Sequence, residues 1–365
     1  VVAGLRKTHI VVGRYRGVDS ALAALLLTRQ GHDVTAVFMK NWDEDDDAEH
    51  CPAAEDLADA ADICERLHIE LKTVSFSGEY WQRVFRYFLD EYQAGRTPNP
   101  DIMCNREIKF RAFLDYAMDL GADAIATGHY ARIAWDNSIR LLRGADPQKD
   151  QTYFLHTLEQ SQLRHSLFPI GDLEKTAVRE IAADAGFTNH AKKDSTGICF
   201  IGERRFRDFL ARYLPAQPGE IRTLDGELIG RHDGLMFYTI GQRQGLGIGG
   251  RRDAAGTPWY VAGKNLENNV LHVVQGVDHP ALFCRNLRAS RLHWIAGSAP
   301  AEGFSVTARI RHRHHDQPCT VELLDAGEWL VSFDRPQLAV TPGQSLVFYD
   351  GETCRGGGII EMATA

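Results

Sequence analysis

In the first third of the chain, short β-rich apolar runs alternate with longer segments of helical periodicity. The apolar runs predict strands at 9–13, 34–39, 71–76 and 123–127. The helical patterns predict helices at 18–29, 53–67, 80–92 and 108–120. This repeated strand–helix order predicts an α/β fold, a doubly wound parallel sheet, whose ligands bind beyond the carboxyl ends of the strands.

From about Gln217 the pattern changes to short alternating runs. Asp225-Gly226 and Asp233-Gly234 are turn sequences typical of β-hairpins. Strands are expected to resume around Trp259 and Val270. This part of the chain is therefore predicted to form a small β-rich unit.

After about Leu282 the pattern is all-β, with alternating runs at 304–310, 329–333 and 345–349. We therefore predict three domains. They are an α/β catalytic domain at 1–215, a β-rich central connector at 216–282 and a C-terminal β-barrel at 283–365.

The composition is that of a globular protein with enough apolar residues for several cores, at 44% hydrophobic and 25% charged. No apolar run approaches the roughly 18 residues that span a bilayer, and no membrane partner is expected. Seven cysteines at irregular spacing do not suggest a disulfide framework, so a cytoplasmic location is expected. The net charge of −8 argues against non-specific coating of nucleic acid, but it leaves room for a structured RNA held by local basic patches.

Two cysteines lie in unusual peptides. Cys104 ends Thr-Pro-Asn-Pro-Asp-Ile-Met-Cys, and Cys199 lies in Asp-Ser-Thr-Gly-Ile-Cys-Phe. Both peptides have the composition of loops, and basic residues flank them, which lowers the pKa of a thiol. The pair indicates sulfur chemistry. By contrast, Cys64 and His68, with Cys51 nearby, fit no structural zinc spacing, so no metal site is predicted.

The first strand leads into Gly-Arg-Tyr-Arg-Gly-Val-Asp-Ser at 13–20. A strand, a turn and a helix that begins at Val18 offer backbone N–H groups and a helix dipole to an anion. The segment resembles the PP-loop of ATP pyrophosphatases, whose pattern is Ser-Gly-Gly-Val-Asp-Ser. Here Tyr15 replaces the serine and Arg16 the first glycine. Arg16 either adds charge for phosphate or blocks the pocket, and the residues leave both alternatives open.

Together with these motifs, the two cysteine peptides resemble those of the tRNA-specific 2-thiouridylases, and the resemblance extends over essentially the whole chain. It implies sulfur transfer to C2 of the wobble uridine of a tRNA anticodon. ATP would adenylate the C2 oxygen, and a persulfide on Cys199, loaded by a donor protein or cysteine desulfurase, would supply sulfur. Cys104 would attack that persulfide or assist the transfer directly, and Asp101 would act as general acid and base.

The resemblance also assigns binding residues. The predicted ATP site consists of Gly13, Gly17, Val18, Asp19, Ser20, Met39 and Gly128. The predicted tRNA contacts are Asn99, Pro100 and Asp101 at the target base, and Lys149, Asp150, Gln151, Arg311 and His312 elsewhere. Magnesium is expected with the ATP phosphates, without identified ligands.

Around Arg311 the run 306–313 alternates strictly. The alternation predicts that Arg309, Arg311 and Arg313 share one exposed strand face, which suits either an RNA backbone or plain solvent.

Two other functions remain open at this point. One is a related enzyme with the same fold and a different acceptor. The other is a tRNA-binding homologue that has lost ATP activation through Tyr15 and Arg16.

Overall fold

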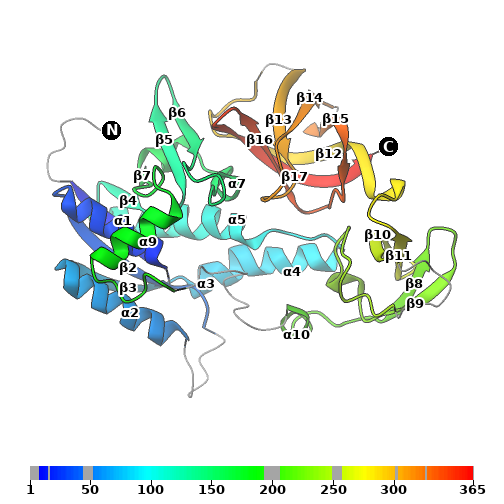
Figure 1. The fold of residues 1–365 in the computed structure, drawn as a ribbon, viewed down its shortest axis with the longest axis horizontal. Coiled ribbons are helices and arrows are strands. Elements are labelled where there is room, and N and C mark those ends of the chain that lie inside the picture. Colours follow the sequence, from blue (N-terminus) through cyan, green and yellow to red (C-terminus); the bar gives the residue numbers. More distant parts are fainter. Residues whose placement is uncertain are drawn as a thin grey trace.

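A computed structural model describes residues 8–14, 17–43, 52–192, 206–248, 257–300, 303–324 and 327–364. Figure 1 shows a sheet covered by helices at one end of the molecule, a small β-rich unit at the other end, and a barrel above them. Among the described residues, no helix is long and apolar enough to cross a bilayer.

The described part of the first sheet has five strands, all parallel, in the order β3-β2-β1-β4-β7. This confirms the predicted doubly wound sheet. The chain builds outward in one direction from β1 to β3 and in the other from β4 to β7, so the order reverses between β1 and β4. The strands are β1 (His9–Arg14), β2 (Asp33–Lys40), β3 (Glu70–Ser75), β4 (Ala124–Ala126) and β7 (Ser166–Leu167).

Successive residues of β1 point to opposite faces of this sheet, as the period of a strand requires. Ile10 and Val12 join a core with α1 (Val18–Arg29), α2 (Pro52–Leu67) and α9 (Lys175–Asp184). Val11 joins a larger core on the other face, formed by the helices of residues 77–119. Both faces are covered at β1, which is why Ile10, Val11 and Val12 are apolar in succession, whereas the edge strand β3 carries polar residues.

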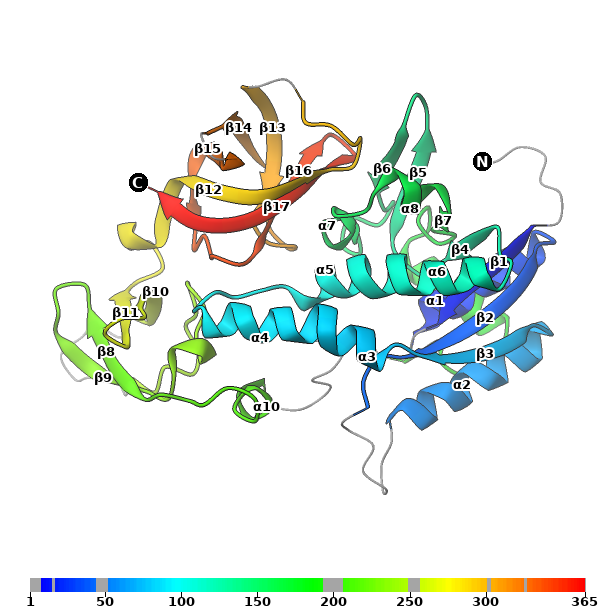
Figure 2. The same cartoon turned by 180° about the vertical axis from the view of Figure 1, so that it is seen from behind.

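Two long helices cover the second face and lie side by side (Figure 2). Each contains a central π-helical stretch, a feature often found at functional sites. The first consists of α3 (Ser77–Tyr80), a π segment (Trp81–Phe85) and α4 (Arg86–Gln93). The second consists of α5 (Pro100–Cys104), a π segment (Asn105–Ala112) and α6 (Phe113–Asp119).

The second helix begins eight residues earlier than the predicted start at 108, which corrects the expectation of a loop around Cys104. Asn99 is the N-cap, since its side chain accepts a hydrogen bond from the backbone N–H of Asp101, and Pro100 occupies the first helical position. Cys104 therefore lies within a helix.

The β-rich unit contains β8 (Gly219–Thr223), β9 (Leu228–His232), β10 (Trp259–Asn265) and β11 (Val270–Gln275), in the order β10-β11-β8-β9. The predicted hairpin at Asp225-Gly226 is confirmed, with Gly226 at a φ of 88°. The hairpin predicted at Asp233-Gly234 is wrong, because a short 3-10 helix (Leu235–Phe237) follows there instead of a strand.

The C-terminal strands close into a barrel, as predicted, because β12 pairs with both β15 and β17. Among the described residues its order is β12-β15-β14-β13-β16-β17. The strands are β12 (Phe283–Trp294), β13 (Phe304–Arg309), β14 (Gln317–Leu323), β15 (Trp329–Leu338), β16 (Ser345–Asp350) and β17 (Thr353–Thr364).

One hairpin of the first part extends the barrel sheet. β6 (Ile139–Arg143), which pairs with β5 (Ala131–Trp135), also pairs with β17 through Leu141 and Leu142. The domain boundaries predicted from sequence stay a prediction, since this sheet crosses the first of them. The remaining described helices are α7 (Thr152–Leu155), α8 (Gln160–Arg164), α10 (Phe206–Leu210) and a 3-10 helix (Pro280–Leu282).

Candidate functional site

The predicted nucleotide site lies where the strand order reverses, at the carboxyl ends of β1 and β4. Gly17 is the N-cap of α1, and the Ser20 hydroxyl donates to its carbonyl oxygen at 3.2 Å. Gly128, just beyond β4, lies directly against this helix start. A Cβ on Gly128 would lie 2.6 Å from the backbone nitrogen of Ser20 and 2.7 Å from the carbonyl carbon of Asp19. Only glycine allows this approach.

Gly13 and Met39 also meet. A Cβ on Gly13 would lie 2.9 Å from Cε of Met39 and 2.8 Å from Cε1 of Phe113. Val18, the first residue of α1, has its side chain buried in the core, so only its backbone is available to a ligand. The structure thus gathers the described members of the predicted ATP site at one end of the sheet. Tyr15 and Arg16 lie outside the described residues.

Asp19 is held by two residues that sequence reasoning missed. The Lys175 ammonium donates to both carboxylate oxygens of Asp19, at 2.7 and 2.9 Å. The Tyr130 hydroxyl donates to one of them at 2.8 Å. Lys175 is only 8% exposed and occupies the first turn of α9. A lysine is unfavourable at this end of a helix dipole, and that mismatch is the signal that could have singled it out.

A second polar group lies at the end of β4. His129 is buried, with Nδ1 2.8 Å from the Thr127 hydroxyl and Nε2 3.4 Å from the Lys109 ammonium. Burial lowers the pKa of His129 well below its usual value, and the charge of Lys109 lowers it further. The imidazole is therefore neutral around pH 7, and its Nε2 can accept a hydrogen bond from the Lys109 ammonium.

The predicted base-contact residues begin helix α5. Asn99 caps this helix, and Pro100 is buried at its first position. Burial raises the pKa of Asp101, while the charges of Lys109 and His312 oppose that rise. A carboxyl with a raised pKa keeps its proton to higher pH, as a general acid must.

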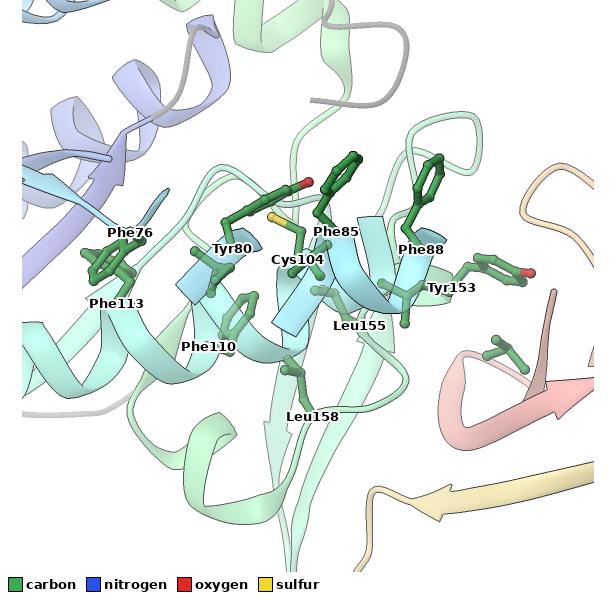
Figure 3. Close-up of a cluster of buried hydrophobic side chains, with 14 of the residues drawn as sticks. Phe76, Tyr80, Phe85, Phe88, Cys104, Phe110, Phe113, Tyr153, Leu155 and Leu158 are labelled. Atoms are coloured by element: carbon green, nitrogen blue, oxygen red, sulfur yellow. The ribbon is translucent and has the colours of Figure 1, made fainter. Parts of the chain in front are cut away.

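Cys104 lies one turn after Asp101 on the same side of the helix, as the spacing of three residues requires. It is 1% exposed and belongs to the large aromatic core. Figure 3 shows it among Tyr80, Phe85 and Leu155. In this conformation solvent does not reach the thiol, so its reaction with a substrate requires the first turn of α5 or its aromatic cover to move.

Cys199 lies outside the described residues, so its predicted pairing with Cys104 stays a prediction. Among the described residues, no group of three or more His, Cys, Asp or Glu side chains is arranged to hold a metal ion.

Two of the three predicted tRNA contacts at 149–151 accept hydrogen bonds from the protein's own backbone. The buried carboxylate of Asp150 accepts hydrogen bonds from the backbone N–H groups of Gly144 and Thr152. Gln151 accepts one from the backbone N–H of Tyr130 at 3.0 Å. Lys149 is half-buried on the same turn. The side chains of Asp150 and Gln151 hold this turn against Gly144 and Tyr130, at the base of the β5–β6 hairpin, so a direct contact of theirs with RNA stays a prediction.

The predicted exposed arginine face is wrong. β13 ends at Arg309, whose guanidinium pairs with Asp316 at 2.5 Å. Arg311 then donates to the carbonyl oxygens of Ile240 and Ala339, both at 3.0 Å, and to the Thr341 hydroxyl at 2.8 Å. The alternation continued in sequence, but the strand did not.

His312 lies over the start of α7. Its ring centroid is 4.4 Å from that of Phe154, and its Nε2 lies 3.0 Å from the carbonyl oxygen of Asp150. Arg311 and His312 therefore join the barrel to the rest of the molecule, and their predicted tRNA contacts stay predictions.

A covered parallel sheet with α1 beginning at its reversal point, followed by a β-rich unit and a barrel, defines the class of protein. Residues 8–203 match the family described as "tRNA methyl transferase HUP domain". Residues 207–275 match "tRNA methyl transferase PRC-barrel domain", and 284–360 match "Aminomethyltransferase beta-barrel domain".

Relatives that match over almost the whole chain identify the family within this class. The chain is 61% identical over 359 residues to the "tRNA-specific 2-thiouridylase MnmA" of Methylococcus capsulatus, covering 98% of this chain and 97% of that protein. It is 59% identical over 361 residues to the protein of the same name from Pseudomonas fluorescens, covering 99% and 96%. The chain belongs to the tRNA-specific 2-thiouridylase family.

Several matching solved structures are more distant in sequence. One of a 4-thiouridine synthetase–RNA complex with bound ATP aligns with a TM-score of 0.38 at 17% identity, covering 57% of this chain and 50% of that chain. Similarity at this level carries no argument about function.

Proposed function

We propose that the protein is an ATP-dependent tRNA sulfurtransferase that forms 2-thiouridine at the wobble position of the anticodon. The observation that carries this proposal is the match to named 2-thiouridylases at about 60% identity over almost the entire chain. The site supports it with the start of α1 at the sheet reversal and with a carboxyl and a thiol on one turn of α5.

ATP would bind at the start of α1. The backbone of Gly17 to Ser20 would face the phosphates, and Gly128 lets the segment after β4 pack directly against this helix start. Magnesium would accompany those phosphates and keep most of its ligands as phosphate and water oxygens, so it needs no cluster of protein ligands. Asp19 offers a carboxylate there, and Lys175 holds it in place.

The sulfur step requires two cysteines. The uridine C2 oxygen attacks the α-phosphorus of ATP, and pyrophosphate leaves. The Cys104 thiolate then attacks Sγ of a Cys199 persulfide, the S–S bond breaks and hydrosulfide is released. Hydrosulfide adds to C2, AMP leaves with the C2 oxygen, and the proton on sulfur is lost. The persulfide sulfur is reduced while the two cysteines are oxidised to a disulfide, which a thiol reductant resets.

Asp101 is the proposed proton carrier at the base. Its position three residues before Cys104 brings a carboxyl to the same side of α5 as the thiol. Its raised pKa allows it to donate to the departing oxygen and to accept a proton afterwards. Asn99 and Pro100, which precede it, are proposed to contact the base.

The proposed partners are a tRNA with an unstacked wobble uridine and a sulfur-donor protein that loads Cys199. An anticodon loop presents such a base without melting a duplex. We place the tRNA between α5 and the barrel, where His312 lies near Asp101 and Asp150.

The competing idea of an inactive tRNA-binding homologue rested on Tyr15 and Arg16. The comparisons do not support it, because full-length relatives at about 60% identity carry the name of an active enzyme class.

The test combines the protein with ATP, magnesium, a cysteine desulfurase with free cysteine, and a tRNA transcript with a wobble uridine. Wild-type protein is expected to release pyrophosphate and to form 2-thiouridine, measured by mass spectrometry of digested tRNA. Cys199→Ala should form none, whereas Cys284→Ala, a half-buried barrel cysteine, should match wild type. Tight tRNA binding without pyrophosphate release or thiolation would overturn the proposal.

A further inference from the structure

The barrel holds the chain just before the proposed catalytic helix. The backbone N–H of Thr97 donates to the carbonyl oxygen of Pro342 at 2.9 Å. The Gln344 amide in turn donates to the carbonyl oxygen of Thr97 at 2.7 Å. Both backbone groups of Thr97 are thus satisfied by one barrel loop, residues 341–344, which we call the barrel clamp.

The barrel clamp packs directly against residues 96 and 97. Gly343 has a φ of +89°, and a Cβ there would lie 2.9 Å from the Thr97 nitrogen and 3.0 Å from Cβ of Arg96. Glycine is needed at this position both for its backbone conformation and for the space. The barrel fixes the loop from behind, because Gly343 donates to the carbonyl oxygen of Ile360 on β17 at 2.8 Å.

The β-rich unit holds the same segment from a third side. The ammonium of Lys264 on β10 donates to the carbonyl oxygen of Gly95 at 2.9 Å. The Thr239 hydroxyl lies 3.4 Å from that of Thr97. Parts of the chain from all three regions therefore converge on residues 95–97, at the carboxyl end of α4.

The segment between Thr97 and α5 is stiff. Two prolines, Pro98 and Pro100, fix their own φ angles and restrict the residues before them. Asn99 between them caps α5. A displacement at Thr97 is therefore passed to the first turn of α5, which carries Asp101 and ends at Cys104.

We propose that the barrel clamp is a positioning element for the first turn of α5, with Gly343 and Gln344 as its positioning residues. It sets where Asp101 lies and keeps Cys104 covered until the tRNA is engaged. Since the barrel is also the proposed tRNA platform, the clamp couples tRNA binding there to the geometry of the reacting turn. The roles of Asp101 and Cys104 rest on the proposed function, but the mechanical link does not.

The test compares Gly343→Ala with Gly297→Ala. Gly297 is a barrel glycine at a φ of +87° with nothing within 4 Å of its added Cβ, so it carries the same backbone strain without the close approach. Native protein is treated with N-ethylmaleimide, and each cysteine is followed by peptide mass spectrometry. Cys354, as buried as Cys104, and Cys64 report any general loosening.

In Gly343→Ala, alkylation of Cys104 is expected to rise about tenfold over wild type, the effect of weakening one or two hydrogen bonds, with Cys354 and Cys64 unchanged. Gly297→Ala should leave all three rates unchanged. In the thiolation assay, kcat of Gly343→Ala should fall about tenfold while KM for ATP stays within about twofold, because the ATP site is at the sheet and not at the clamp. Gln344→Met removes the amide donor at similar volume and should show the same pattern if Gly343→Ala does not fold.

Unchanged Cys104 alkylation in both variants would overturn the proposal, whatever the activity. So would an equal rise at Cys104, Cys354 and Cys64, because that is general destabilisation. If wild-type protein does not thiolate tRNA but Cys104 alone becomes reactive in Gly343→Ala, the clamp stands and the proposed function fails.

Discussion

The Lys175–Asp19 ion pair gives the sharpest energetic prediction for the nucleotide site. Replacing Lys175 by methionine keeps the aliphatic stem but removes the ammonium from the Asp19 carboxylate, which keeps its hydrogen bond from Tyr130. The side chain of Asp19 is 26% exposed and that of Lys175 10%, so the pair lies between the buried and exposed limits. Breaking a buried pair costs about 3–5 kcal/mol and an exposed one below about 1 kcal/mol, so we expect a loss of about 2 kcal/mol.

The two single variants, Lys175→Met and Asp19→Asn, should lose different amounts of stability. Asp19→Asn leaves an uncompensated charge on Lys175, the less exposed partner, and is expected to cost about 3 kcal/mol. The double variant leaves no charge unpaired, so it should cost less than the sum of the two by about 1–2 kcal/mol. Pyrophosphate release should still be lost, because the carboxylate at the phosphate site is gone.

The assay is native-state hydrogen exchange of the α1 amides, because a chain of several cooperative parts does not unfold in one step. The free energy of opening is compared among wild type, the two single variants and the double variant at pH 7. Asp62→Asn, in a solvent-exposed pair with Arg66 on α2, is the control and should change little. Strictly additive effects, or a change below about 0.5 kcal/mol in Lys175→Met, would refute the reasoning.

Three further predictions concern the rest of the site. Asp101→Asn should abolish thiolation. It should also gain stability relative to wild type as pH rises, because the raised pKa of Asp101 makes its ionisation unfavourable in the folded state. The free energy of opening of the α5 amides, measured by native-state hydrogen exchange from about pH 4 to 8, checks the sign. Burial lowers the pKa of Lys264 to about 8, so the folded state binds fewer protons than the unfolded state between there and the usual 10.5. As pH rises through that window, the stability of wild type relative to Lys264→Met should therefore increase. A stability difference that does not change with pH would count against burial as the cause of the lowered pKa. Arg311→Gln loses hydrogen bonds to Ile240, Ala339 and Thr341 and should lower the free energy of opening of the barrel amides by about 2 kcal/mol in native-state hydrogen exchange. Weaker tRNA binding at unchanged stability would contradict the internal role.

Local signals in the sequence were reliable where one segment decides its own structure. The helix predicted at 18–29 spans the observed bounds of α1, and β1, β2, β3 and β4 lie within a residue or two of their predicted places. The short edge strand β7 was not predicted. The start of α5 was missed although Asn99-Pro100 is a cap followed by a proline at the first helical position. There the abundance of turn-forming residues outweighed the capping signal.

Contacts between residues far apart in the chain could not be predicted from local sequence patterns. The alternation at 306–313 predicts exposed arginines, but Arg309 and Arg311 meet Asp316, Ile240 and Ala339, which strand periodicity cannot reveal. Lys175 lies 156 residues from Asp19 along the chain. No local pattern joins them.

The sequence by itself determined the alternation of strands and helices up to residue 127, the start of α1 and the peptides that carry Asp101 and Cys104, because these depend on side-chain periodicity and backbone preference. Only the tertiary structure decided which charges pair at the nucleotide site, that Cys104 is covered by aromatic rings, and that the barrel grips Thr97. Those outcomes depend on burial and on contacts between residues far apart in the chain. Burial decides whether a carboxyl, thiol or guanidinium stays available or is used inside the protein.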